Sequence, residues 1–145
     1  MTRSAFLLTI VMLFGPLAFG CQKGRALEDD FQREVDRELA RAASHGDIEA
    51  MDAAVEDGAD PNSCISDGSS QLKIAYTYRN KRGFEHLLEL GADPHHADNN
   101  GSRVIHYVAL NYESSDWIEM ILKHGGEPNM TEPAVDQIRD GRCTP

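Results

Sequence analysis

The sequence predicts an all-α fold built from a stack of helix-turn-helix units. The tetrad Gly58-Ala59-Asp60-Pro61 recurs as Gly91-Ala92-Asp93-Pro94, and a looser third copy follows at almost the same spacing as Gly125-Gly126-Glu127-Pro128. A run of apolar residues with helical spacing precedes each copy, at 50–55, 84–88 and 117–122. Self-similarity at a period in the thirties is typical of repeat proteins, in which one unit is too small to bury its own apolar face.

Each tetrad is predicted to end a helix. Its glycine supplies the left-handed backbone conformation that closes a helix C-terminus at low steric cost. The proline three residues later cannot continue a helix, because it lacks the N–H and clashes with the preceding turn. The chain is therefore expected to leave the second helix of each unit sharply and to enter an extended hairpin.

Two further segments resemble the ankyrin pattern Gly-x-Thr-Pro-Leu-His-x-Ala. The second unit opens at Asp67-Gly68 and matches at Leu72 and Ala75, while the third opens at Asn100-Gly101 and keeps Ile105, His106 and Ala109. The substituted positions are Ser70, Gln71, Lys73, Arg103 and Val104. The resemblance implies an ankyrin-repeat solenoid, with connecting hairpins and two antiparallel helices per unit. It also implies that His106 braces its hairpin to the helix, whereas Lys73 weakens the corresponding brace.

The chain divides into about three repeats and a truncated fourth. We assign residues 38–66, 67–99 and 100–139 to the three repeats, the first of which begins with outward charges as a capping repeat does. Residues 130–140 are expected to form an enlarged finger. Residues 140–145 carry the opening of a fourth repeat without its helices. A truncated reading frame or a fragment, and a native ending that pairs with a partner, are both open explanations.

Residues 1–20 are predicted to be a signal peptide, and residues 21–37 a lipidated cysteine and a polar tether. The apolar run after Arg3 is shorter than the roughly 20 residues of a permanent membrane-spanning helix. Residues 17–21 resemble a bacterial lipobox, in which Cys21 would be acylated and Gln22 would indicate the outer membrane. The alternative is an ordinary cleavage site that leaves Cys21 as a free thiol; either ending implies export. The tether becomes a helix near Asp29-Asp30 or stays a flexible spacer.

The chain is acidic, with 24 Asp and Glu against 14 Lys and Arg and a formal net charge of −10. This balance argues against nucleic acid or an anionic membrane surface as a partner, because both attract clustered Lys and Arg. Membrane contact is therefore expected through the lipid anchor alone. The acidity is compatible with a basic protein partner, although acidic surfaces more often serve solubility.

The motifs expected of an enzyme are absent. The sequence has no Gly-x-Ser-x-Gly elbow, phosphate-binding loop or Cys-x-x-Cys, so we expect neither catalysis nor a cofactor. His95 and His96 with Asp93 and Asp98 come nearest to a metal-ligand set, but adjacent hairpin residues point to opposite sides. Cys64 is expected two repeats away from Cys143. No disulfide between them is predicted, because Cα atoms must lie within about 7 Å.

The sequence favours a protein-binding surface instead. In ankyrin domains the hairpin tips and inner helices line a concave face that holds a protein partner. The resemblance places these residues on that face: Ile65, Asp67, Tyr76, Tyr78, His95, His96, Asn99, Tyr107, Asn111 and Tyr112. Tyrosine suits an interface because it buries a large area with few rotors. For Tyr76 and Tyr78, packing between repeats is the alternative, and Trp117 is expected in the core.

Exported ankyrin lipoproteins of this size resemble the immunity proteins that protect bacteria against type VI secretion phospholipase effectors. The resemblance implies a periplasm-facing lipoprotein that binds an incoming lipase and occludes its active-site entrance. A second class is a periplasmic ankyrin adaptor that supports a resident enzyme, such as catalase in oxidative defence. An adjacent lipase-effector gene would favour the first class, and an adjacent catalase gene the second.

Overall fold

The structure, a computed structural model, describes residues 26–111 and 115–128. This part of the chain is all-α, as predicted, and contains no β-strand. Its elements are η1 Leu27–Asp30, α1 Glu34–His45, α2 Ile48–Glu56, α3 Gln71–Thr77, α4 Lys81–Glu89, α5 Val104–Ala109 and α6 Ser115–Lys123. None of the helices in the described ranges is long and apolar enough to cross a bilayer.

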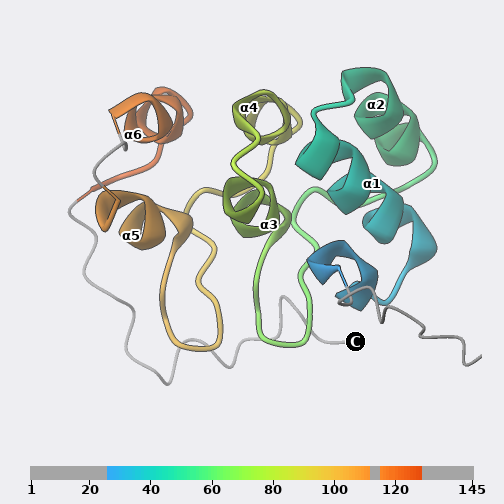
Figure 1. Cartoon of the computed structure of the whole chain (residues 1–145), viewed down its shortest axis with the longest axis horizontal. Coiled ribbons are helices and arrows are strands. Elements are labelled where there is room, and N and C mark those ends of the chain that lie inside the picture. The colour runs from blue at the N-terminus through green and yellow to red at the C-terminus, as the bar shows by residue number, and fades with distance from the viewer. Residues whose placement is uncertain (1–25, 112–114, 129–145) are drawn as a thin grey trace, which may run out of the picture.

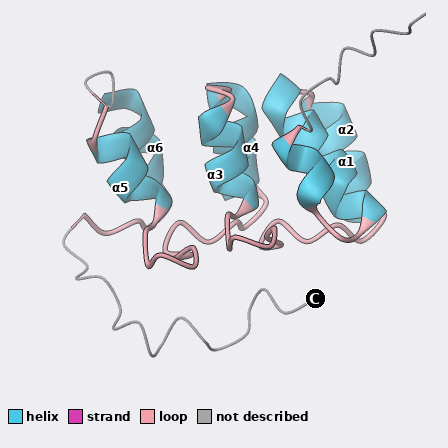
Figure 2. Ribbon diagram, turned by 60° about the horizontal axis from the view of Figure 1, so that its bottom comes forward, coloured by secondary structure: helices cyan, strands magenta, loops and turns pink. Residues whose placement is uncertain are grey.

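The helices form three pairs that stand side by side, which we call the first, second and third layers (Figure 1). α1 packs on α2, α3 on α4, and α5 on α6. Neighbouring layers meet where α1 contacts α3 and α4, where α3 contacts α5, and where α4 contacts α6. The inner helices α1, α3 and α5 form one row and the outer helices α2, α4 and α6 the other. The loops that lead from one layer to the next follow one edge of the stack (Figure 2).

Each tetrad glycine adopts the left-handed conformation predicted for it. The φ angles of Gly58, Gly91 and Gly125 are 95°, 91° and 87°. The next backbone N–H then returns to the carbonyl five residues earlier, as from Ala59 to Ala54 at 2.8 Å. The equivalent bonds are Ala92 to Leu87 at 2.9 Å and Gly126 to Ile121 at 2.8 Å. The same local geometry therefore ends the outer helix of every layer.

The outer helices of the first two layers begin at side-chain caps. Asp47 accepts a hydrogen bond from the Ala50 N–H at 3.1 Å, and Asn80 accepts one from the Gly83 N–H at 2.9 Å. Such caps satisfy N–H groups that the first helical turn leaves unpaired. Asn80 also donates to the Ser44 carbonyl at 3.2 Å, so this cap links the second layer to the first.

One apolar cluster runs through all three layers. Trp117, which was expected in the core, is 3% exposed and meets the rings of Tyr76 and Phe84 edge-on, at centroid distances of 5.2 and 5.1 Å. Edge-to-face contacts of this kind add to the free energy of burial. Other fully buried members of the cluster are Leu39, Met51, Leu72, Leu87, Val108 and Ile121. The core thus joins helices of different layers and not merely the two helices of one pair.

α4 approaches α1 closely at a position without a side chain. A Cβ built on Gly83 would lie 2.0 Å from the carbonyl oxygen of Ala43. That distance is far inside van der Waals contact, so the two helices can approach in this way because residue 83 is glycine.

The first layer begins earlier than the predicted boundary at residue 38. α1 starts at Glu34 and η1 precedes it, so of the two alternatives left open the helix near Asp29-Asp30 agrees with the structure, and residues 27–37 are not a spacer. The reason is Phe31, which is 2% exposed and packs in a small cluster with Ala40, Ile65 and Ile74. An aromatic side chain in an otherwise polar stretch thereby fixes the entry into α1.

The loops before α3 and α5 are narrow hairpins, each closed by one antiparallel bridge. The bridges join Cys64 to Ser70 and Ala97 to Arg103. Cys64 is disulfide-bonded. Cys21 and Cys143 are the other cysteines of the sequence. Both lie outside the described residues, so the absence of a Cys64–Cys143 bridge stays a prediction; so do the signal peptide, acylation, enlarged finger and fourth repeat.

Candidate interaction surface

The two hairpins are joined edge to edge. The backbone N–H of Asn99 donates to the Asp67 carbonyl at 3.1 Å, and the Asn99 side chain donates to the Ser66 carbonyl at 3.0 Å. Asp67 and Asn99 are exposed although their backbones are held in place. Two of the predicted binding residues thus lie together on an ordered hairpin edge.

His95 and His96 lie on this edge but reach in opposite directions along the stack, as predicted for neighbours in a hairpin. The Nε2 atom of His95 lies 2.9 Å from the Gly125 carbonyl of the third layer. The Nε2 atom of His96 lies 2.9 Å from the Gly68 carbonyl of the preceding hairpin. In the described ranges no group of three His, Cys, Asp or Glu residues is arranged to hold a metal ion. Both histidines therefore connect neighbouring turns.

Lys73, Asp98 and Tyr107 form a polar cluster between the second and third layers. Lys73 Nζ donates to Asp98 Oδ2 at 2.7 Å and to Tyr107 Oη at 3.2 Å, and the Tyr107 hydroxyl donates to Asp98 Oδ2 at 2.6 Å. Burial alone would raise the pKa of Asp98, but these donors outweigh it and hold the pKa below its ordinary value. Burial would lower the pKa of Lys73, yet its partners raise it. Lys73 and Asp98 are therefore both charged at neutral pH.

Lys73 and His106, which occupy corresponding positions in α3 and α5, make different contacts. His106 acts as the resemblance implied, since its Nδ1 accepts from the Arg103 N–H at 3.2 Å at the start of α5. Lys73 stands at the corresponding place in α3, but its longer side chain reaches Asp98 in the next hairpin. A local brace is therefore replaced by a bridge between layers.

A second cluster lies toward the other end of the inner helices. The Tyr76 hydroxyl donates to the Tyr107 carbonyl at 3.2 Å and accepts from the Asn111 side chain at 2.5 Å. Tyr76 is only 6% exposed and packs on Trp117, so the packing alternative describes it better than a binding role. Asn111 also accepts from the guanidinium of Arg79 at 3.2 Å.

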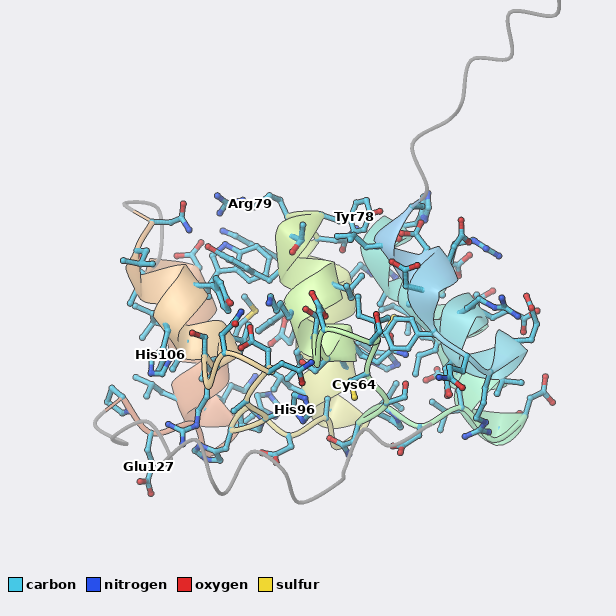
Figure 3. The ribbon with its side chains drawn as sticks, turned by 90° about the horizontal axis from the view of Figure 1, so that it is seen from below. Cys64, Tyr78, Arg79, His96, His106 and Glu127 are labelled. Carbon is cyan, nitrogen blue, oxygen red and sulfur yellow. The ribbon has the colours of Figure 1, made fainter. Side chains whose placement is uncertain are left out.

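Tyr78 is exposed in part but already engaged by the N-terminal segment. The residue is 41% exposed, while its hydroxyl donates to Glu28 at 2.6 Å and accepts from the Leu27 N–H at 3.3 Å. Burial of the hydroxyl and its bond to the Glu28 carboxylate raise the pKa of Tyr78. Figure 3 shows Tyr78 and Arg79 along one edge of the stack, away from Cys64 and His96.

The structure divides the predicted binding residues into groups. Ile65 is 5% exposed and packs with Phe31, so it belongs to the core and not to a surface. Asp67, Tyr78 and Asn99 are exposed, and His95, His96, Tyr107 and Asn111 are half-buried. Tyr112 lies outside the described residues.

Sequence reasoning missed Lys73 as a link between layers and Arg79 as a surface cation. The available signal for Arg79 was its place one repeat period after Gly46, at the repeat position of a glycine.

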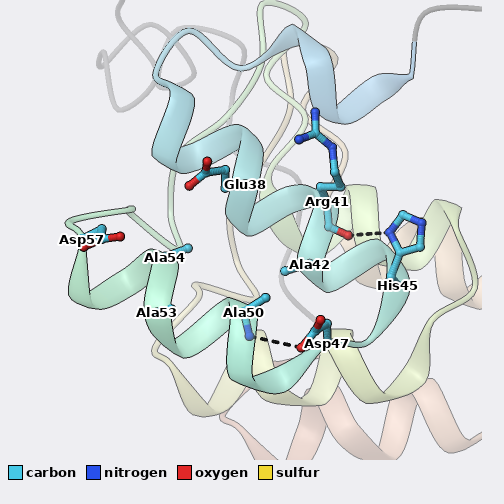
Figure 4. A pocket seen from close by; sticks show the side chains of 9 residues that line it. All are labelled: Glu38, Arg41, Ala42, His45, Asp47, Ala50, Ala53, Ala54 and Asp57. Carbon is cyan, nitrogen blue, oxygen red and sulfur yellow. Dashed lines mark hydrogen bonds between the residues drawn. The ribbon is translucent and has the colours of Figure 1, made fainter.

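The first layer carries a hollow of about 410 Å³ between α1 and α2, away from the hairpins (Figure 4). Its lining comprises Glu38, Arg41, Ala42, His45, Asp47, Ala50, Ala53, Ala54 and Asp57. Two of the polar groups serve the helices themselves. His45 Nδ1 lies 2.8 Å from the Arg41 carbonyl, and Asp47 caps α2. The alanines make much of the lining apolar.

Comparison with known proteins adds little about function. No protein-family model matches the chain. An L-asparaginase from Dirofilaria immitis is 35% identical over 82 residues, which make up 56% of this chain. The matched part is 14% of the length of that enzyme. The similarity therefore concerns a small portion of the enzyme.

Proposed function

We propose that this chain is an exported ankyrin-repeat lipoprotein that binds a protein partner, and that it is an immunity protein against a type VI secretion lipase effector. In this proposal the hairpin edge and the inner helices hold the effector and occlude its active-site entrance. Acylated Cys21 would anchor the protein to the outer membrane on its periplasmic side. The protein itself would have no catalytic role.

The observation that supports the ankyrin assignment is the common register of the three layers. The turns at Gly58, Gly91 and Gly125 follow one another at a nearly constant spacing and are closed by the same backbone hydrogen bond. Hairpins of equal form precede α3 and α5. Repetition of one supersecondary unit at this period, with each unit packed on its neighbours, is what a repeat protein requires.

The polar hairpin edge supports protein binding. Asp67 and Asn99 present exposed side chains on backbones that are already hydrogen-bonded to each other. A surface ordered before binding loses less conformational entropy when a partner arrives. Export is supported by the signal-like segment 1–20 and agrees with the disulfide-bonded state of Cys64, since disulfides persist in oxidising compartments.

A pull-down from envelope extract, with residues 22–145 as bait and mass spectrometry as readout, tests the proposal. Recovery of a lipase whose activity falls as bait is titrated in is the expected result. A double variant, Asp67→Ala with Asn99→Ala, should weaken that inhibition, whereas Glu49→Ala on the outer helix α2 should not. Recovery of catalase or another resident enzyme would reject immunity and favour the adaptor function instead.

A further inference from the structure

Arg79 has a backbone conformation that disfavours every residue with a Cβ. Its φ is 56°, and among the described residues it is the one non-glycine with a positive φ. It stands in the turn between α3 and α4, one repeat period after Gly46, which has a φ of 71° in the corresponding turn of the first layer. Glycine adopts this conformation freely, whereas an L side chain is strained in it. Residue 79 is thus a repeat position for glycine that carries arginine.

The contacts of Arg79 within the chain do not account for this choice. Its guanidinium carbon lies 5.1 Å from the centroid of the Tyr76 ring, and one nitrogen donates to Asn111 at 3.2 Å. Both contacts are made by an exposed residue, where cation–π and polar interactions contribute little to folding. Strained backbone conformations that no interaction within the fold offsets are found most often at functional positions.

The turn that holds Arg79 carries three cationic side chains, and its Tyr78 is hydrogen-bonded to the carboxylate of Glu28. Tyr78, Arg79, Lys81 and Arg82 are all exposed and belong to residues 78–82, which we call the basic turn. Lys81 forms an ion pair with Asp116 of α6 at 2.5 Å. In the described part of the chain the guanidinium of Arg82 forms no ion pair. The turn is therefore a local concentration of positive charge on a protein whose formal net charge is −10.

We propose that the basic turn is a docking surface for an acidic segment of a protein partner, and that Arg79 is the residue that recognises a carboxylate. This inference rests on the proposed function as a protein-binding module and adds a second contact with the partner, on the edge of the stack away from His96. A guanidinium can hold a carboxylate through two parallel hydrogen bonds, which an ammonium cannot do. The neighbouring side chains of Tyr76 and Asn111 orient the guanidinium without neutralising it.

Charge favours a peptide segment over an anionic membrane as the occupant. An anionic membrane presents negative charge over a wide area to a molecule whose formal net charge is −10, so repulsion from the acidic residues near the contact opposes its binding. A single acidic segment can contact the basic turn and avoid the rest of the surface. Because the turn carries cations and the whole molecule is acidic, an acidic peptide segment is favoured over an anionic membrane.

The test compares the chain of residues 22–145 with Arg79→Gly, using a fluorescently labelled Glu-rich peptide as the probe at low and at high salt. Arg79→Gly should weaken peptide binding about tenfold, which corresponds to the loss of one charge-assisted pair. The thermal midpoint of unfolding should not fall, because glycine suits the left-handed position. Arg79→Lys should recover part of the affinity, and Lys123→Gln, which removes a charge on α6, should leave binding unchanged.

Each result decides the inference. Equal peptide affinity for Arg79→Gly and the natural chain would overturn it, as would an equal loss in Lys123→Gln. Tighter binding to phosphatidylglycerol vesicles than to the peptide would overturn it in favour of a membrane. The titration does not use the physiological partner, so an Arg79-dependent peptide site together with failure to capture a lipase would reject immunity alone. Capture of a lipase with Arg79-independent peptide binding would reject the docking surface alone.

Discussion

Lys73 and Asp98 join the second layer to the third through a hydrogen-bonded ion pair, with 2.7 Å between Nζ and Oδ2. The Asp98 side chain is 2% exposed, while 21% of the Lys73 side chain is exposed. The second carboxylate oxygen, Oδ1, accepts from the N–H groups of Asn100 and Ser102 at 2.9 and 3.1 Å. One buried carboxylate thus holds its own hairpin in shape and fastens it to the preceding inner helix.

Lys73→Met should lower the free energy of unfolding by about 2 kcal/mol, because a buried carboxylate loses its cation while keeping its other donors. Urea unfolding followed by circular dichroism measures the change. The matched control is Lys123→Met, which breaks an exposed ion pair with Glu85. That variant should cost less than about 0.5 kcal/mol. Equal losses in the two variants would show that the Lys73–Asp98 pair contributes no more to stability than an exposed ion pair does.

The same pair predicts a loss of stability in acid. The pKa of Asp98 is lowered on folding, so its contribution is present above the ordinary value near 3.8 and is lost as pH falls through the lower folded value. The difference in unfolding free energy between the natural chain and Asp98→Asn should therefore shrink as the medium is acidified from about pH 5 to about pH 3. A difference that stays constant over this range would contradict the assignment.

His86 should stabilise the outer row of helices in its protonated form. Its Nε2 lies 2.6 Å from Asp52 of α2 and its Nδ1 lies 2.9 Å from Glu89, so both ring nitrogens face carboxylates. Burial alone would lower the pKa of His86, but the two carboxylates raise it above its ordinary value near 6.5. Since the folded pKa is raised, the contribution is complete below the ordinary value and is lost as pH rises through the folded one.

His86→Gln should accordingly cost more stability near pH 6 than near pH 8.5, although less than about 1 kcal/mol because both carboxylates are half exposed. Unfolding curves of the two chains at both pH values supply the comparison. Added salt should reduce the effect at the lower pH. A penalty that does not depend on pH would mean that the histidine acts through packing alone.

Gly83→Ala should destabilise the fold even though alanine is the better helix former. The added methyl group would collide with the Ala43 carbonyl, and overpacking of this kind costs about 1–3 kcal/mol. Gly91→Ala is a useful contrast, because a Cβ there meets nothing within 4 Å and the substitution affects the left-handed backbone alone. Its cost should be about 1 kcal/mol. Thermal unfolding of both variants would separate helix contact from backbone strain.

Cys64 offers a chemical test of the proposed lipid anchor. A cysteine whose sulfur carries a diacylglycerol thioether cannot form a disulfide, so acylation of Cys21 leaves Cys143 as the partner for Cys64 within one chain. Peptide mapping of the exported protein without reduction identifies the partner, and metabolic labelling with palmitate detects the anchor. A Cys21–Cys64 disulfide in the exported protein would rule out acylation. A Cys64–Cys143 disulfide is the result expected with an acylated Cys21, and it would refute the predicted absence of that bridge.

The helical layers were predictable because residues that end helices are visible in the local sequence. Gly58 and Pro61 end a helix through their own backbone chemistry, which is the same wherever the fold places them. The start of α1 was harder to predict, since it depends on Phe31 packing against Ile65 and Ile74 from a later part of the chain. The local sequence left a helix near Asp29-Asp30 and a flexible spacer as alternatives, and the tertiary contacts of Phe31 decide between them.

The candidate surface was predictable only in outline, because exposure depends on distant partners. Asp67 and Asn99 lie on the hairpin edge where the resemblance placed them, whereas Tyr76 is buried by Trp117, which belongs to the next layer. The role of Lys73 was predicted by comparison with the histidine at that position of the repeat pattern, but its partner Asp98 belongs to the following hairpin. A repeat pattern defines a position within a unit, and the contacts between units decide what that position does.

The stacking order also has a consequence for how the molecule opens. In the described part of the chain α3 and α4 contact helices on both sides, whereas the first and third layers each have one neighbour. Amide protons of α3 and α4 should therefore exchange with solvent most slowly, while α5 and α6 open without disturbing α1 and α2. Unfolding of α3 and α4 would therefore remove the packing partners of the first and third layers at the same time.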